Sequence, residues 1–161
     1  MDRPDHLGQP VISVTIATTE DAVAWATMRQ ALWPKGNPGR HDADIAQLLA
    51  DPGSTINFIA RGNDSRPIGF AEAGLRHDYV NGTESSPVAF LEGIFVDPVF
   101  RRTGVARRLV GAVEDWARQR GCSELASDTG IANIASQNMH NALGFTETQR
   151  VVYFRKSLVG P

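Results

Sequence analysis

The chain has 161 residues, of which 42% are hydrophobic and 21% are charged, a composition typical of one globular domain. Its net charge of −2 argues against broad binding to nucleic acids or anionic membranes, which needs a basic surface. The single cysteine, Cys122, excludes an intrachain disulfide and fits a reducing compartment, so we expect a cytoplasmic protein.

The first part of the chain predicts a strand, two helices and three more strands. We expect residues 1–10, which are polar and hold two prolines, to form a loose arm, and residues 11–161 to form one domain. The predicted elements are a strand at Val11–Ala17, a helix from Thr18 or Thr19 to Leu32, a helix capped by Asp42 or Asp44, and strands at Thr55–Arg61, Pro67–Arg76 and Val88–Val96. Asn81-Gly82 is the strongest hairpin signal, since both residues tolerate positive φ.

The second part alternates helices and strands. Its predicted elements are an amphipathic helix from Val105 to Gly121, a strand at Leu125–Ser127, a helix at Ile134–Leu143 closed by Gly144, and a last strand at Arg150–Leu158. The order is therefore β α α β β β α β α β. Antiparallel strands followed by βαβ units indicate an α/β fold with one mixed sheet.

The segment from Arg101 to Arg108 links a buried strand to the strongest helix. Gly104 and Ala106 let a ligand approach the main chain, and the first N–H groups of a helix attract anions. The segment is therefore either a phosphate cradle or an ordinary helix start with a basic surface. Neither a P-loop nor a dinucleotide-binding glycine motif occurs, so a phosphate-bearing ligand would be held by the main chain.

Glu92-Gly93 interrupts the apolar strand at Val88–Val96. A glycine inside a strand often marks a bulge, and a glutamate there needs a partner, a cleft or solvent at the edge of the sheet. Because the neighbouring residues are apolar, we favour the cleft.

These features together resemble a known family. The pattern Arg101-x-x-Gly104-x-Ala106 after an apolar strand, with Asn133 and Leu143-Gly144-Phe145 downstream, resembles the acetyl-CoA site of the GNAT superfamily of N-acetyltransferases. Longer blocks resemble the bacterial aminoglycoside 6′-N-acetyltransferases within it: Leu32–Pro34, Arg76–Gly82, Ser85–Pro87, Phe90–Val96 and Ala126–Thr129. The resemblance implies the GNAT-type acyl-CoA N-acyltransferase fold and transfer of an acetyl group to an antibiotic, hence resistance.

The resemblance also implies an acetyl-CoA site. Its residues would be Ile94, Phe95, Val96, Arg102, Thr103, Gly104, Val105, Ala106, Arg107 and Asn133. A strand N–H near Ile94 would stabilise the oxyanion. Without the resemblance, Asn133 is equally well explained as the cap of the helix that follows.

For the antibiotic, the resemblance points to Trp33, Tyr79, Glu92 and Asp128 as pocket residues, while Gln149 stands where the relatives carry an acidic one. Physical reasoning agrees, because a polycationic sugar needs carboxylates and an aromatic wall. Lys35, close to Trp33, is a departure that places a positive charge where a cation would bind.

The reaction needs a neutral amine, so a carboxylate or water must remove a proton. We expect Glu92 or Asp128 to act as base, directly or through water, during direct attack in a ternary complex, with Tyr153 as a candidate general acid. Cys122 is better explained as a packing residue than as a nucleophile. The four histidines lack metal-ligand spacing, so no metal is expected.

Two other functions stay open: acetylation of another small polyamine or a peptide amine, and non-catalytic binding of an acyl-CoA. The predicted carboxylates at Glu92 and Asp128 favour an enzyme over a binding module. The resemblance further implies a homodimer, in some relatives with shared C-terminal strands, which the β-rich segment at Arg150–Leu158 permits.

Overall fold

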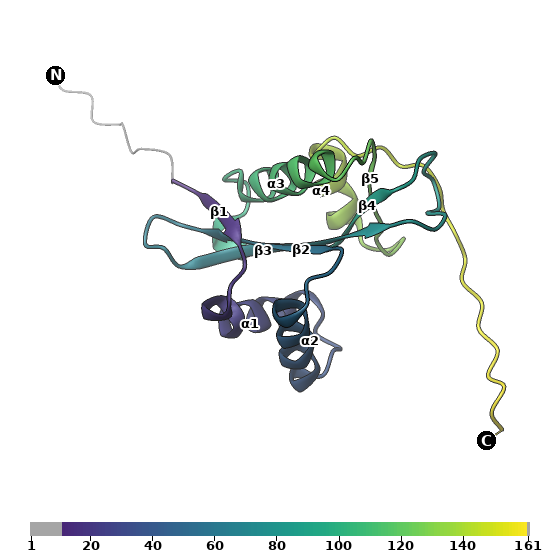
Figure 1. The fold of residues 1–161 in the computed structure, drawn as a ribbon, viewed down its shortest axis with the longest axis horizontal. Coiled ribbons are helices and arrows are strands. Elements are labelled where there is room, and N and C mark those ends of the chain that lie inside the picture. The colour runs from purple at the N-terminus through teal and green to yellow at the C-terminus, as the bar shows by residue number, and fades with distance from the viewer. Residues whose placement is uncertain (1–10, 161) are drawn as a thin grey trace.

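The computed structural model describes residues 11–160, so the predicted arm at residues 1–10 lies outside the described part. One five-stranded sheet has the strand order β1-β2-β3-β4-β5. Helices α1 and α2 cover one face of the sheet, and α3 and α4 cover the other (Figure 1). Within residues 11–160, no helix combines the length and the apolar character that crossing a membrane requires.

The strands are β1 (Ser13–Ile16), β2 (Thr55–Arg61), β3 (Pro67–Arg76), β4 (Val88–Val96) and β5 (Leu125–Ser127). The predicted bounds of β2 to β5 are confirmed, and β1 is shorter than predicted. Neighbouring strands from β1 to β4 pair antiparallel, whereas β4 and β5 pair parallel. The mixed sheet is therefore confirmed, with its only parallel pair at the β5 edge.

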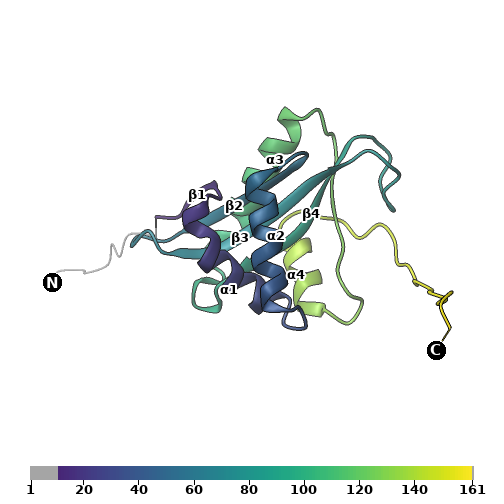
Figure 2. The same ribbon diagram turned by 60° about the horizontal axis from the view of Figure 1, so that its bottom comes forward.

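The helices are α1 (Ala22–Leu32), α2 (Pro38–Ala50), α3 (Val105–Gln119) and α4 (Ile134–Ala142), with short 3-10 turns η1 (Thr19–Asp21) and η2 (Pro98–Phe100). Figure 2 shows α1 and α2 lying across the sheet on their face. The α3 helix is held by an apolar stripe, in which Val105, Leu109 and Val113 are at most 1% exposed. Each such side chain contributes about 1.5–3 kcal/mol through burial, so α3 is firmly docked on the sheet.

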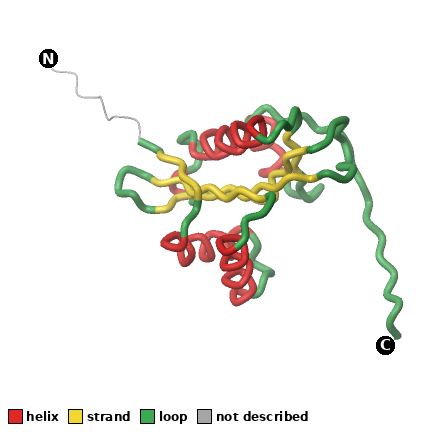
Figure 3. The backbone as a smooth tube through the Cα atoms, viewed as in Figure 1, coloured by secondary structure: helices red, strands yellow, loops and turns green. Residues whose placement is uncertain are grey.

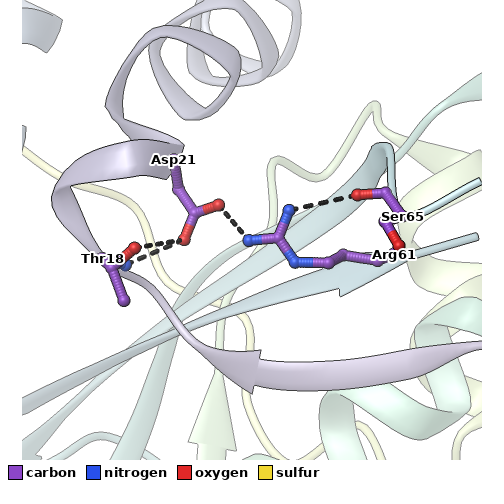
Figure 4. A network of polar contacts seen from close by, with 4 residues as sticks. All are labelled: Thr18, Asp21, Arg61 and Ser65. Carbon is purple, nitrogen blue, oxygen red and sulfur yellow. Dashed lines mark hydrogen bonds and ion pairs between the residues drawn. The ribbon is translucent and has the colours of Figure 1, made fainter.

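On the opposite face, the start of α1 is fixed by buried charge (Figure 4). The main-chain N–H of Thr18 donates to Asp21 Oδ2 at 2.8 Å, and Arg61 on β2 forms an ion pair with the other oxygen of Asp21. The same guanidinium donates to the carbonyl of Ser65 at 3.3 Å. Thr18, one of the two predicted caps, thus begins the helical segment, and β2 holds it in place.

The predicted start of α2 is wrong. Neither Asp42 nor Asp44 caps the helix, because Asn37 does so instead: its side-chain oxygen accepts from the main-chain N–H of Gly39 at 2.9 Å. Pro38 occupies the first helical position, where its missing N–H costs nothing. A segment that its composition marked as a loop therefore supplies the first turn.

Two predictions in the second part also need correction. Asn81-Gly82 forms a turn inside a long connection between β3 and β4, and not a two-residue hairpin. The predicted last strand at Arg150–Leu158 does not form: the segment makes no strand pairing and runs away from the sheet (Figure 3). A strand needs a neighbour for its main-chain groups, and the described chain offers none to this segment.

Candidate active site

The site is built on a fork between β4 and β5. The two strands pair from Ala89 with Leu125 to Leu91 with Ser127, where β5 ends. Beyond this point β4 continues to Val96 and pairs only with β3. No other described strand pairs with the second edge of residues 92–96, so its main-chain N–H and C=O groups are available to bind an extended ligand.

A bulge lies where the fork opens. In the register of β3 and β4, Glu72 is opposite Gly93 and Ala73 is opposite Leu91, which leaves Glu92 without a partner. This confirms the bulge that the glycine indicated. Gly93 is also needed for close packing, because a Cβ there would lie 2.6 Å from Cζ2 of Trp33.

Trp33 belongs to the α1 and α2 face and is not among the residues that line the cavity described below. The guanidinium of Arg29 lies 5.2 Å from the centre of its ring. Arg29 in turn lies 3.3 Å from Glu72 Oε1, which accepts from Trp25 Nε1 at 2.8 Å. The buried ion pair of Arg29 and Glu72 thus holds Trp33 against the bulge at Gly93.

Burial raises the pKa of Glu72, while Arg29 and the Trp25 hydrogen bond act in the opposite direction. The buried carboxylate is held by partners from α1, and it fixes α1 against β3 directly behind the fork. Sequence reasoning did not single out Glu72, because nothing in the pattern of β3 distinguishes a functional from a structural glutamate.

The start of α3 lies beyond the far end of the open edge. Arg102 and Gly104 both have positive φ, +63° and +91°, and a Cβ on Gly104 would meet no atom within 4 Å. Arg101 Nε donates to the carbonyl of Val96 at 3.1 Å, which ties this turn to β4. The first intrahelical bond runs from Arg108 to Gly104, so the preceding N–H groups of α3 have no helical acceptor. The turn therefore presents main-chain donors to solvent.

A cavity of about 1090 Å³ lies on the other side of the fork. It is lined by β4, β5, the connection between β3 and β4, α4 and the C-terminal segment, and its lining holds six carboxylates against three arginines. Each of these arginines is already paired with a carboxylate: Arg76 with Glu92, Arg118 with Glu114, and Arg150 with Glu147. The cavity is therefore electrostatically suited to a cation.

Most of the predicted substrate and catalytic residues come together there. Tyr79, Glu92, Asp128, Gln149 and Tyr153 all line the cavity. Glu92 is in contact with Arg76 at 2.6 Å, whereas Asp128 has no ion pair or hydrogen bond from any described side chain. Tyr79 and Tyr153 are 78% and 80% exposed, so both have room to move against a ligand.

Two other predicted residues have structural contacts. The side-chain oxygen of Asn133 accepts from the main-chain N–H of Ser136 at 3.1 Å and caps α4. Cys122 is buried, and desolvation raises the pKa of its thiol, which fits a packing residue. Among the described residues, no group of three His, Cys, Asp or Glu side chains is arranged to hold a metal ion.

Sequence reasoning missed one polar pair in the lining. His140 Nε2 lies 2.9 Å from Ser127 Oγ, at the last paired residue of β5. The histidine was considered only as a metal ligand. The sequence could have pointed to Ser127 by its position, since it ends a predicted strand directly before the predicted site residue Asp128.

Comparison with known proteins identifies the family to which this chain belongs. The family model described as acetyltransferase (GNAT) family matches residues 22–145. The chain belongs to this family. A relative from Serratia marcescens, named aminoglycoside N(6′)-acetyltransferase type 1, is 54% identical over 90% of this chain and 99% of its own length. A relative of the same name from Stenotrophomonas maltophilia is 49% identical over 88% of this chain and 91% of its own length.

Solved structures agree with this acetyltransferase in fold. The enzyme AAC(6′)-Iy in complex with a bisubstrate analogue, CoA-S-monomethyl-acetylneamine, superposes with a TM-score of 0.85 at 46% identity, covering 91% of this chain and 99% of that one. The aminoglycoside 6′-N-acetyltransferase AAC(6′)-Ih from Acinetobacter baumannii gives 0.87 at 42% identity, covering 92% and 100%. The GNAT fold and the resemblance to the aminoglycoside 6′-N-acetyltransferases are confirmed.

Proposed function

We propose that the protein is an aminoglycoside 6′-N-acetyltransferase that moves an acetyl group from acetyl-CoA to the 6′-amine of the antibiotic and so confers resistance. The observation that carries the proposal is the open edge of β4, which joins main-chain donors at the start of α3 to an acidic cavity. Acetyl-CoA is an anion and an aminoglycoside is a cation, so the two ends of this edge match the two substrates.

The coenzyme end rests on main-chain groups. The diphosphate would lie at the turn from Arg102 to Arg107, and the pantetheine arm would pair with Ile94, Phe95 and Val96 like an added strand. Asn133 keeps its side-chain nitrogen available for the arm while its oxygen caps α4. The thioester carbonyl would then accept a hydrogen bond from the main chain near the bulge, where a developing oxyanion is stabilised.

The antibiotic end rests on side chains. Asp128 and Glu92 would receive ammonium groups, Tyr79 would pack against a sugar ring, and Gln149 would bind hydroxyls. Trp33 lies outside the cavity and would act by packing against Gly93, which keeps the conformation of the bulge fixed. This assigns Trp33 a positioning role and leaves the cavity wall to Tyr79.

The two candidate bases differ in their ion pairing. Glu92 is ion-paired with Arg76, so a substrate cation must compete with a guanidinium for it. Asp128 has no such partner among the described residues and lies next to the fork. We therefore assign removal of the amine proton to Asp128, directly or through water, and binding of the antibiotic to Glu92.

The proposal includes a homodimer in the cytoplasm. The C-terminal segment exposes a run of large apolar side chains, with Val152 at 78%, Phe154 at 93% and Leu158 at 92%. A monomer rarely leaves such a run in water, and a second copy of the chain would cover it. Cys122, the one cysteine, is free and buried, which fits a reducing compartment.

The test is release of free CoA thiol from acetyl-CoA, with kanamycin-type aminoglycosides, linear polyamines and peptides offered as acceptors. We expect turnover with the aminoglycosides, and acetylation mapped to the 6′-nitrogen by NMR. Faster turnover with a polyamine or a peptide would favour the alternative acceptor class. Binding of acetyl-CoA without thiol release on any amine would favour a non-catalytic module. Light scattering of the same preparation checks the dimer.

A further inference from the structure

Ser127 and His140 meet where β4 and β5 separate, and neither takes part in the steps described so far. His140 on α4 places Nε2 2.9 Å from Ser127 Oγ, and both residues line the cavity. Ser127 is paired with Leu91, the residue directly before the bulge at Glu92. The pair therefore lies at the fork itself.

The surroundings of His140 decide which nitrogen can exchange a proton. Nδ1 lies 2.7 Å from the carbonyl oxygen of Ser136, which only accepts, so Nδ1 carries a hydrogen. Phe145 packs edge-on against the ring, with 5.1 Å between the ring centres. Nε2 is thus the nitrogen that gains and loses a proton, and it faces Ser127.

The hydroxyl of Ser127 has two acceptors but one hydrogen. Besides Nε2 of His140, the carbonyl oxygen of Leu91 lies within reach, at 3.2 Å. With neutral His140, the hydroxyl donates to Nε2. With protonated His140, Nε2–H donates to the hydroxyl oxygen, and the hydroxyl turns to Leu91. Each state has its hydrogen bonds satisfied, so the pair can exchange a proton without leaving either side chain unpaired.

We propose that Ser127 and His140 form a proton relay to the CoA sulfur, an inference that rests on the proposed function. The neutral amine adds to the thioester carbonyl, which forms the C–N bond and the oxyanion; collapse of this adduct breaks the C–S bond, and the electron pair of that bond goes to sulfur. The sulfur takes the hydroxyl proton of Ser127, which His140 Nε2 replaces, while Asp128 receives the amine proton. Ser127 is then the general acid, in place of Tyr153. His140 is the positioning residue that returns a proton to Ser127, and solvent reprotonates His140.

Charged groups lie on the segments around the pair. Among them are Glu92, Glu124, Asp128 and Arg107, and Glu114 and Arg118 on α3 line the same cavity. Arg107 donates to the carbonyl of Ala142 at the end of α4, and Glu92 is engaged by Arg76. Asp128 directly follows Ser127 and has no ion pair among the described residues, so the proposed acceptor of the amine proton is next in the chain to the proposed donor of the sulfur proton.

The test compares His140→Gln and Ser127→Ala with the wild type. Glutamine keeps a donor toward Ser127 but does not titrate, so it preserves a structural contact and removes the relay. We expect kcat with a kanamycin-type aminoglycoside to fall about 10²-fold in each variant, with the acetyl-CoA Kd from calorimetry unchanged. In the wild type kcat should fall at alkaline pH, and this limb of the profile should be absent from both variants. His77→Gln, the same change at an exposed histidine outside the cavity, is the control.

Three outcomes overturn the relay. The first is wild-type kcat in His140→Gln or in Ser127→Ala. The second is a reduced kcat with the alkaline limb still present, which would show that His140 only holds α4 against β5. The third is wild-type protein that releases no thiol on any amine, and this result alone overturns the proposed function as well. Wild-type turnover together with either of the first two results overturns the relay only.

Discussion

The two ends of the open β4 edge bear opposite charge, and they do so by different means. At the start of α3, the groups offered to a ligand are main-chain N–H donors in a turn shaped by positive φ at Arg102 and Gly104. At the cavity, they are side chains, with six carboxylates of which Asp78, Glu124 and Asp128 have no basic partner among the described residues. One end therefore depends on the path of the main chain, and the other on the identity of particular residues.

This difference predicts how the ends respond to change. Side-chain replacement should matter at the cavity and matter little at the α3 turn, whereas a change that bends the main chain should matter most at the turn. It also fits the two substrates, since the diphosphate of CoA is invariant and aminoglycosides differ in the placement of their amines.

The largest effect is expected at the acidic end. Asp128→Asn should lower kcat about 10²- to 10⁴-fold, because it removes the proposed acceptor of the amine proton while keeping its shape. Steady-state kinetics with saturating acetyl-CoA measure this. Asp115→Asn, an exposed carboxylate on α3 outside the cavity, is the matched control and should leave kcat unchanged. Equal kcat for wild type and Asp128→Asn would move the base to Glu92 or to water.

The second-largest effect is expected at the start of α3, where main-chain groups would bind acetyl-CoA. Gly104→Ala forces a side chain into φ +91°, which costs about 1–2 kcal/mol even though nothing lies within 4 Å. If the turn must hold this conformation to bind, acetyl-CoA affinity falls roughly five- to thirtyfold. Calorimetry with acetyl-CoA measures it, and Gly111→Ala in the middle of α3 is the control. Unchanged affinity would separate the turn from coenzyme binding.

Removing the charge of Arg102 at the same turn should lower acetyl-CoA affinity less than Gly104→Ala does. Arg102→Gly deletes the guanidinium and relieves the positive φ of +63°, so the main chain keeps its path. We expect acetyl-CoA affinity to fall less than about fivefold at low salt and to equal the wild type at high salt, where exposed charges are screened. A larger loss that persists in salt would contradict main-chain recognition.

The smallest effect concerns a carboxylate that holds the cavity rim. Glu124 accepts from the Ser85 hydroxyl and from the main-chain N–H of Glu84 at 2.9 Å, and the Ser85 hydrogen bond is the largest cause of its lowered pKa. The folded pKa lies below the ordinary value of 4.5, so the ionised group stabilises the fold above that pH. This contribution is lost as the pH falls through the lowered pKa.

Glu124→Gln should therefore melt slightly below the wild type at pH 7, and the gap should close as the solution is acidified below pH 4.5. Thermal melts across that range measure it, with Glu20→Gln, an exposed carboxylate on η1, as the control. A gap that stays constant with pH would mean that the rim is held by contacts other than this ionised carboxyl.

Local sequence patterns were enough to predict many of the helices and strands. The apolar stripe of α3 and the bounds of β2 to β5 follow from helical and strand periodicity, which a short stretch of residues expresses by itself. The bulge followed from one glycine beside one glutamate. The start of α2 was misplaced because Asn37 and Pro38 were assigned to a loop by composition, although the same residues make a good cap and first turn.

Residues close together in the chain were enough to establish the order of the elements, the turn at Gly104 and the carboxylate at Asp128 directly after β5. The contacts of Arg76 with Glu92, of Trp33 with Gly93 and of His140 with Ser127 could be seen only in the folded chain. These contacts join residues on different elements, and the packing of helices on the sheet fixes their distances. The unpaired segment at Arg150–Leu158 has the same cause, since a strand forms only where the fold supplies a neighbour.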